Sequence, residues 1–391
     1  MVERLKSFTL DLPPSCVEFW PNDSRYAIIG TYNLEKSKDE GTHTEEEAED
    51  VRQKKPQQRS GSLIIVRVQN DDVEIVETLS TASAILDLHF APSYLPPSVF
   101  AVATSTGSIG IYQLRTQQGN ATPENSDIET ATPELYHFKT LQFYPEDVIV
   151  TAFTWHPNRS AVAMTLSDGS VCIEEVDIDH PPTARSAGGF GAHDLEAWTL
   201  AFLPDGSGLY SGGDDSALNY WVLNTSSESL PDEENANPIT LRWSDKKTHG
   251  AGVTAIIPLD VNEQRALVLT GSYDDNIRLI SAPSIGRRNV LAEMNLGGGV
   301  WRLKRIHSSS DSSFPKGSEI LLLASCMHAG ARILRLTCNG EEDWQFQVVA
   351  RFEEHRSMNY GSDCQPTLDA KGQRTFISTS FYDRLLCVWN Y

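Results

Sequence analysis

Chemically reactive side chains are few along this chain, and none stands in a familiar catalytic motif. The clearest candidates are Cys326 and His328, which lie two residues apart in the segment ASCMHAG at 324–330. A His titrates near neutral pH, so His328 could act as a general base, or it could be a local packing variant. There is no G-x-S-x-G elbow, HExxH motif, P-loop or dinucleotide fingerprint. Motifs alone identify no enzyme, so function must be sought in how the fold positions such residues.

A repeated pattern defines the elements around these residues. Three segments share an apolar strand, a step of small residues, an Asp that follows any residue, and a second strand: LYSGGDDSALNYW at 209–221, LTGSYDDNIRLIS at 269–281 and ISTSFYDRLLCVWNY at 377–391. In the first and third, Trp221 and Trp389 follow Asp215 and Asp383 by six residues, whereas the unit with Asp274 has lost its Trp. This pattern is typical of WD repeats.

Looser copies of the pattern bring the number of units to seven. They cover 30–36 continued at 61–68, 101–114, 161–176 and 321–336. Short apolar or alternating runs without a long helical period indicate an all-β chain. A propeller blade needs four strands, but the seventh unit ends at Tyr391 before its outer strand. The sequence therefore predicts an all-β, seven-bladed WD-repeat β-propeller in which the N-terminal strand 4–12 completes the last blade.

The polar insertions between the repeat strands do not suggest further domains. They have few apolar anchors, so we expect mobile loops within a single propeller domain over residues 1–391. The insertions lie at about 35–60, 115–134, 225–238 and 308–318.

Several residues of the repeat are expected to be structural. In WD repeats the Asp typically accepts a hydrogen bond from a His that stands before a first strand, and His193, His249 and His355 occupy that His position. This interpretation covers the whole structural set: His193, Asp215, Trp221, His249, Asp274, Asp383 and Trp389, together with His355.

The amino-acid composition limits the kinds of partner and the cellular location that we expect for this protein. The net charge of −21 makes general binding to nucleic acid unfavourable and suits a partner with a cationic feature. No apolar run is long enough to span a bilayer, and the N-terminus lacks a hydrophobic signal core. We expect a cytosolic or nuclear protein, with the cytoplasm as its predicted location. The six cysteines show no metal-ligand spacing, so neither a metal nor a cofactor is expected.

One mouth of the central channel is the expected binding site. The turns before each template Asp and the segments that lead into the first strands bring aromatic and acidic residues to this opening: Tyr32, Glu196, Trp198, Asp214, Tyr273, Trp301, Tyr360 and Tyr382. Aromatic faces beside carboxylates suit a cation, particularly a quaternary ammonium. As an alternative, Trp198 and Trp301 could simply pack between blades.

Particular segments resemble a known family. The chain is similar to the WD-repeat diphthine methyl ester hydrolases in GTYNLEK (30–36), AHDLEAW (192–198), YSGGDD (210–215), GSYDDNI (271–277), GGVWRLK (298–304), ASCMHAG (324–330) and SFYDRLLCVW (380–389). This resemblance implies removal of a methyl ester from diphthine methyl ester, a modified His on translation elongation factor 2, during diphthamide biosynthesis. The substrate side chain also carries a trimethylammonium group. A monomer is expected, because a closed propeller leaves no free sheet edge.

The resemblance assigns no catalytic residue, so the mechanism is a hypothesis. Water could attack with help from His328 or His355, while backbone N–H groups of Gly-rich turns stabilise the oxyanion. A covalent route through Cys326 is the weaker hypothesis, because that strand position is usually buried. The alternative from another class is a non-catalytic WD-repeat scaffold that recruits proteins.

Overall fold

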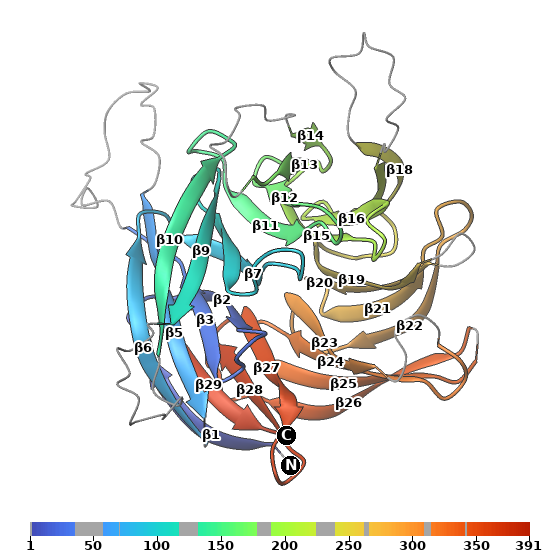
Figure 1. Ribbon diagram of the computed structural model, residues 1–391. Coiled ribbons are helices and arrows are strands. Elements are labelled where there is room, and N and C mark those ends of the chain that lie inside the picture. Colours follow the sequence, from blue (N-terminus) through green and yellow to red (C-terminus); the bar gives the residue numbers. More distant parts are fainter. Residues whose placement is uncertain are drawn as a thin grey trace, which may run out of the picture.

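A computed structural model describes residues 2–35, 58–69, 71–116, 132–177, 189–223, 239–261, 266–308, 314–340 and 342–391. Within these ranges the strands form seven antiparallel sheets that radiate from a central axis, which confirms the predicted seven-bladed propeller (Figure 1). The predicted insertions lie mostly outside the described residues, and the extent of the single domain remains a prediction. Among the described residues no helix is long and apolar enough to cross a bilayer.

The first four blades follow one another along the chain. Blade 1 contains β2 (Pro14–Phe19), β3 (Tyr26–Thr31), β5 (Arg59–Gln69) and β6 (Asp72–Thr81), with the short β4 (Asn33–Leu34) paired to β5. Blade 2 contains β7 (Ile85–Phe90), β8 (Val99–Thr104), β9 (Ser108–Thr116) and β10 (Pro133–Gln142). Blade 3 contains β11 (Val150–Trp155), β12 (Ala161–Leu166), β13 (Ser170–Glu175) and β14 (Phe190–Gly191). Blade 4 contains β15 (Ala197–Phe202), β16 (Gly208–Gly213), β17 (Leu218–Leu223) and β18 (Ile239–Asp245).

The last three blades complete the ring. Blade 5 contains β19 (Val253–Val261), β20 (Ala266–Ser272), β21 (Asn276–Ser281) and β22 (Asn289–Asn295). Blade 6 contains β23 (Arg302–Ser308), β24 (Glu319–Ser325), β25 (Ala331–Cys338) and β26 (Trp344–Phe352). Blade 7 contains β27 (Gly361–Leu368), β28 (Arg374–Thr379), β29 (Leu385–Asn390) and β1 (Glu3–Thr9).

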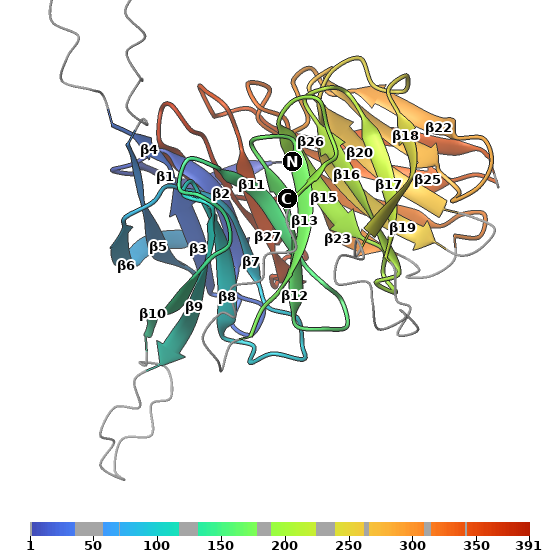
Figure 2. The same cartoon turned by 90° about the horizontal axis from the view of Figure 1, so that it is seen from above.

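The N-terminal strand closes the ring as the sequence predicts. β1 pairs antiparallel with β29, with Glu3 opposite Asn390 and Thr9 opposite Leu385. Both termini consequently lie side by side at blade 7, as the two perpendicular views show (Figure 1, Figure 2). This pairing covers the edge that β29 would otherwise expose, and an open sheet edge invites association with other chains.

The hydrophobic core consists of side chains packed between neighbouring blades. This packing is clearest at Trp389 of blade 7, whose ring stacks on Phe352 of blade 6 at a centroid distance of 4.9 Å and on Phe376 at 4.3 Å. Trp389 is 1% exposed. Such interblade packing fixes the inner strands rigidly, so side chains at their ends and along the channel hold defined positions.

Candidate functional site

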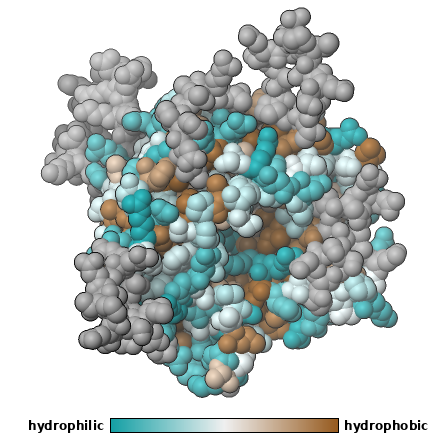
Figure 3. All heavy atoms as spheres, in the orientation of Figure 1, coloured by the Kyte–Doolittle hydropathy of each residue, from teal (hydrophilic) through white to brown (hydrophobic). Residues whose placement is uncertain are grey.

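Aromatic rings gather at one end of the inner strands. Trp301, immediately before β23, lies at the centre of this group, with ring centroids 4.9 Å from Tyr360, 5.6 Å from Trp198 and 5.9 Å from Tyr273. Trp198 belongs to blade 4 and Trp301 to blade 6, so their rings meet across the opening rather than between neighbouring blades. In the space-filling view, hydrophobic and hydrophilic surfaces lie side by side around the centre of the ring (Figure 3).

A second set of contacts extends the group to blades 7 and 1. The Phe381 ring lies 5.5 Å from Tyr360, 5.1 Å from Tyr382 and 6.1 Å from Tyr32. We call the complete cluster the aromatic mouth: Tyr32, Trp198, Tyr273, Trp301, Tyr360, Phe381 and Tyr382. The structure therefore brings together all six aromatic residues that the sequence nominates for binding. It adds Phe381, which sequence reasoning missed although it directly precedes Tyr382.

Carboxylates border the blade 4 and blade 5 side of the aromatic mouth. The exposed Asp214 accepts a hydrogen bond from the indole Nε1 of Trp198 at 3.4 Å. Burial raises the pKa of Tyr273 above its usual range, and Asp214 and Glu196 add to this effect, so the phenol stays neutral. A Cβ on Gly252 would lie 2.8 Å from both Asp214 Oδ1 and the Tyr273 ring, so only Gly permits this close approach. Neutral rings beside carboxylates favour a cationic ligand.

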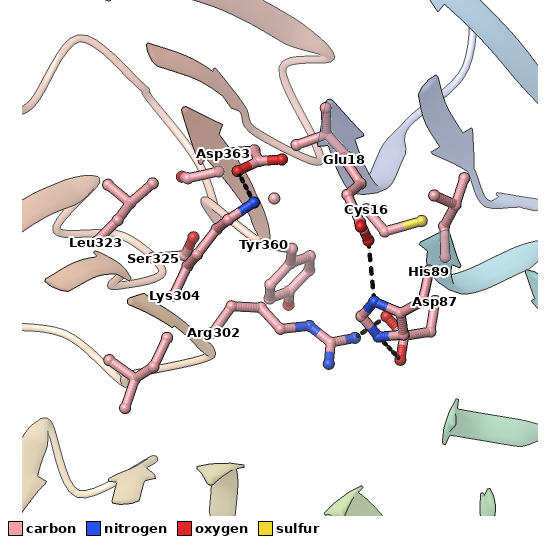
Figure 4. A pocket seen from close by; sticks show the side chains of 15 residues that line it. Cys16, Glu18, Asp87, His89, Arg302, Lys304, Leu323, Ser325, Tyr360 and Asp363 are labelled. Carbon is pink, nitrogen blue, oxygen red and sulfur yellow. Dashed lines mark hydrogen bonds and ion pairs between the residues drawn. The ribbon is translucent and has the colours of Figure 1, made fainter. Parts of the chain in front are cut away.

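A cavity of about 270 Å³ extends from Tyr360 along the inner strands. Charged side chains from four neighbouring blades line it, as the close view shows (Figure 4). We call this set the charged channel: Glu18 of β2, Asp87 and His89 of β7, Arg302 and Lys304 of β23, and Asp363 of β27. None of these six residues was nominated from the sequence. The available signal was the alternation of charged with apolar residues in inner strands that should be apolar, as in LDLHF and RLK.

The charges of the channel are paired across the opening. Arg302 donates to Asp87 at 2.9 Å. His89 lies 3.0 Å from Glu18 through Nδ1 and 3.3 Å from Asp87 through Nε2. Burial alone would lower the pKa of His89, but Asp87 and Glu18 outweigh it and raise that pKa to about 10. His89 is therefore an imidazolium that donates to both carboxylates, which makes it unsuitable as a general base.

The second pair is tied to the backbone of neighbouring blades. Lys304 forms an ion pair with Asp363, which also accepts hydrogen bonds from the N–H groups of Phe19 at 2.7 Å and Cys364 at 2.6 Å. Burial alone would lower the pKa of Lys304, but the negative charges of Asp363 and Glu18 have the larger effect and raise this pKa. In the parts of the chain that the structure describes, no group of three His, Cys, Asp or Glu side chains could hold a metal ion.

The three catalytic candidates from the sequence differ in their exposure to solvent. His355 is buried, with Nε2 2.8 Å from Ser378 Oγ, and burial lowers its pKa to about 4 despite the opposing effect of Asp383. Cys326 is 0% exposed, and burial raises the pKa of its thiol to about 12. A neutral thiol in the interior is a poor nucleophile, so the covalent route loses its support. His328 alone is exposed.

The turn that carries His328 has two left-handed residues, Met327 (φ 43°) and Gly330 (φ 77°), where the turns of blades 4, 5 and 7 have one each. In blades 4, 5 and 7 the one left-handed residue directly follows the template Asp. Its counterpart in blade 6 is Gly330, whose N–H donates to the carbonyl of Met327 as the N–H of Ser216 donates to Gly213. The carbonyl of Met327 accepts a hydrogen bond from the N–H of Asn359 at 3.0 Å. The blade 6 turn is thereby joined to the segment that carries Tyr360.

The structural residues of the repeat form the expected hydrogen bonds most completely in blade 4. His193 Nδ1 lies 2.9 Å from Asp215, its Nε2 lies 2.9 Å from Ser211, and Trp221 donates to the same Ser211 hydroxyl at 2.9 Å. In the other two blades with a His the direct His–Asp bond is absent among the described contacts. His249 bonds Thr270 while Asp274 pairs with Arg278, and Asp383 accepts from Arg356 N, Ser357 and Ser380. Trp389 donates to Ser378, the same hydroxyl that His355 contacts.

Fold and site together define the class of this protein: a WD-repeat propeller whose aromatic mouth leads into a charged channel. Residues 185–221 match the family described as WD domain, G-beta repeat. Among solved structures, Sqt1 of Chaetomium thermophilum bound to the N-terminus of ribosomal protein L10 aligns with a TM-score of 0.59 at 14% identity, over 97% of this chain and 86% of that chain. A chain of the mitotic checkpoint complex aligns with a TM-score of 0.59 at 13% identity, over 99% and 91%. These likenesses show the fold alone.

Three curated proteins are similar to this chain in sequence. The chain is 26% identical over 430 residues to diphthine methyltransferase of Saccharomyces cerevisiae, which covers 98% of this chain and 97% of the relative. It is 28% identical to the Schizosaccharomyces pombe protein of the same name, over 95% and 94%, and 25% identical to the human one, over 92% and 74%. Over more than nine tenths of its length the chain is thus similar to three proteins named diphthine methyltransferase.

Proposed function

We propose that this protein acts in diphthamide biosynthesis as a carboxylic-ester hydrolase on diphthine methyl ester of translation elongation factor 2. The names of the relatives point to diphthine as the substrate. The family resemblance of the sequence points to removal of the methyl group. In this reaction the oxygen of a water molecule adds to the ester carbonyl carbon, and the bond from that carbon to the methoxy oxygen then breaks. The methoxy group leaves as methanol, and the acid formed releases a proton to solvent to become a carboxylate.

The aromatic mouth is the observation that carries this proposal. A trimethylammonium group attached to the substrate side chain is a cation that cannot donate a hydrogen bond, so it is recognised chiefly by aromatic faces and nearby carboxylates. The rings of Trp301, Tyr360 and Tyr273 supply such faces, and Asp214 stands beside them. Each cation–π contact is worth roughly 0.5–2 kcal/mol depending on its desolvation.

His328 is the proposed base for the attacking water. It is exposed, and its turn is joined through Met327 to the segment preceding Tyr360. His355 and Cys326 are left out of the proposed mechanism, because both are buried at positions of the repeat that hold the blades together.

The test is a mass measurement on the substrate. Purified protein is incubated with elongation factor 2 that carries methylated diphthine, and the modified peptide is analysed by mass spectrometry. Hydrolysis removes the mass of one CH₂ group per site. A gain of one CH₂ on unmethylated diphthine, with a methyl donor present, would instead establish methyl transfer, as the relatives' name states. Stable binding without a mass change would favour the non-catalytic scaffold.

Two tyrosines test the role of the mouth. Tyr273→Ala and Tyr382→Ala remove ring faces and should raise KM several-fold, whereas Tyr382→Phe keeps the ring and should preserve KM. Tyr382 is 70% exposed, so its replacement should leave the fold intact. Unchanged KM in both Ala variants would refute recognition of the cation by this cluster.

A further inference from the structure

Arg302 lies where the aromatic mouth meets the charged channel. It directly follows Trp301, and its guanidinium carbon is 5.9 Å from the centroid of the Trp301 ring. It lines the same cavity as Tyr360, whose ring is 4.9 Å from that of Trp301. A ligand held against these two rings would therefore have the guanidinium as its neighbour on the channel side (Figure 4).

The guanidinium of Arg302 has more N–H donors than its bond to Asp87 uses. Arg302 reaches across the channel from blade 6 to blade 2 and donates from Nη2 to Asp87. Among the described residues this carboxylate is its one hydrogen-bonding partner, although a guanidinium carries five N–H donors. The side chain is 25% exposed, so some of these donors face the cavity.

Asp87 is anchored independently of Arg302. Its carboxylate accepts a hydrogen bond from the N–H of Phe153 at 3.2 Å and contacts His89 at 3.3 Å. The anchored carboxylate thus holds the guanidinium in place without occupying its whole donor edge. Lys304 pairs with Asp363, whose carboxylate also accepts hydrogen bonds from two backbone N–H groups.

We infer that the aromatic mouth and Arg302 form a two-part site for a ligand in which a quaternary ammonium stands beside a carboxyl group, either esterified or free as the carboxylate. The rings take the ammonium. Arg302 donates to the carbonyl oxygen of the ester before hydrolysis and to the carboxylate afterwards, since charged acceptors strengthen such hydrogen bonds. This inference rests on the proposed function, because it assumes that the ester and the trimethylammonium enter the same site.

Small probes test the two halves separately. The full chain is titrated by calorimetry with glycine betaine, which has both groups, and with tetramethylammonium, which has only the cation. The wild-type protein should bind betaine about tenfold more tightly, the effect of one charge-assisted hydrogen bond. Arg302→Gln should abolish the preference for betaine without lowering the affinity for tetramethylammonium. Arg302→Lys should retain part of the preference for betaine. Arg335→Gln, an arginine of β25 on the same blade that pairs with Glu319, is the matched control and should behave as wild type.

The outcomes separate this inference from the proposed reaction. Loss of the preference in Arg302→Gln, with tetramethylammonium binding retained, supports the two-part site and shows that the variant is folded. An equal affinity of wild-type protein for both probes overturns it, as does a preference that survives in Arg302→Gln. If the protein removes the methyl group while either overturning result is obtained, the proposed function stands without Arg302. If the preference depends on Arg302 but no demethylation occurs, the betaine site stands and the hydrolase proposal fails.

Discussion

Replacing His355 with Gln separates a structural from a catalytic role for this residue. His355 is 6% exposed, and its Nε2 shares the Ser378 hydroxyl with the indole of Trp389. Its ring also packs against Phe352, with centroids 5.5 Å apart. A Gln side chain can still reach Ser378 but loses the ring contact. We expect His355→Gln to cost about 1–2 kcal/mol of stability at pH 7.5, while kcat for ester removal stays unchanged.

The pH dependence gives this prediction a magnitude. Burial lowers the pKa of His355 from 6.5 to about 4 in the folded protein. Because the folded pKa lies below the unfolded one, the unfolded state binds more protons between these values, and stability falls as the pH is lowered from 6.5 towards 4. The loss from His355 amounts to about 1.4 kcal/mol at pH 5.5 and about 3 kcal/mol at pH 4. His249, whose pKa is also lowered to about 4 by burial and by Arg278, adds a loss of the same sign.

Urea unfolding at pH 7.5 and pH 5.5 measures this difference. Between the two pH values the free energy of unfolding of the wild-type protein should fall by about 1.4 kcal/mol more than that of His355→Gln, because the variant lacks the titrating group. The exposed His307 provides the control, and His307→Gln should follow the wild type. Equal pH dependence of the wild type and His355→Gln would refute the buried neutral His. A folded His355→Gln protein with kcat reduced a hundredfold would return His355 to the catalytic mechanism.

Three further outcomes follow from the structure. Trp301→Leu should raise KM about tenfold by removing the central ring of the mouth, whereas Trp243→Leu, which removes a half-buried indole of blade 4, should leave KM unchanged in steady-state assays. Deletion of residues 2–9 should lower the melting temperature by about 5 °C or more in calorimetry, because β29 loses its partner; an unchanged melting temperature would contradict closure by β1. His328→Ala should reduce kcat about a hundredfold or more, and wild-type turnover would remove this residue from the mechanism.

The sequence was sufficient for the propeller because each blade repeats one local pattern. The step of small residues, the Asp and the following strand occupy equivalent turns, so the residue before the Asp could be assigned to the channel mouth without coordinates. That positional logic placed Tyr273 and Tyr382 in one cluster. It missed Phe381 because blade 7 has one residue more between Ser378 and Asp383 than blade 4 has between Ser211 and Asp215, so only one residue of this turn was considered.

The charged channel could not be predicted in the same way. Its pairs join residues that are remote in sequence, such as Asp87 and Arg302, which are 215 positions apart. A repeat pattern states which side chains share a level in the ring, but not which of them reach across it. The sequence nominated His355 and Cys326 for their residue types, and it anticipated burial only for Cys326. In the structure burial dominates both pKa values and therefore what each group can do.

The distribution of charge among the inner strands argues that the channel serves more than stability. The inner strands of blades 3 and 4, VTAFTW and AWTLAF, contain no charged residue, and these blades are part of the same closed ring. Buried ion pairs are often no more stabilising than apolar residues of similar size, because desolvation offsets their attraction. Stability alone therefore does not account for Asp87, Arg302 and Lys304. Asp87 lies in blade 2 and Arg302 and Lys304 lie in blade 6, on the same side of the ring as blades 7 and 1. Blades 6, 7 and 1 supply five of the seven rings of the aromatic mouth. The charged residues and most of the rings therefore lie close to one another, as a binding site for a charged group requires.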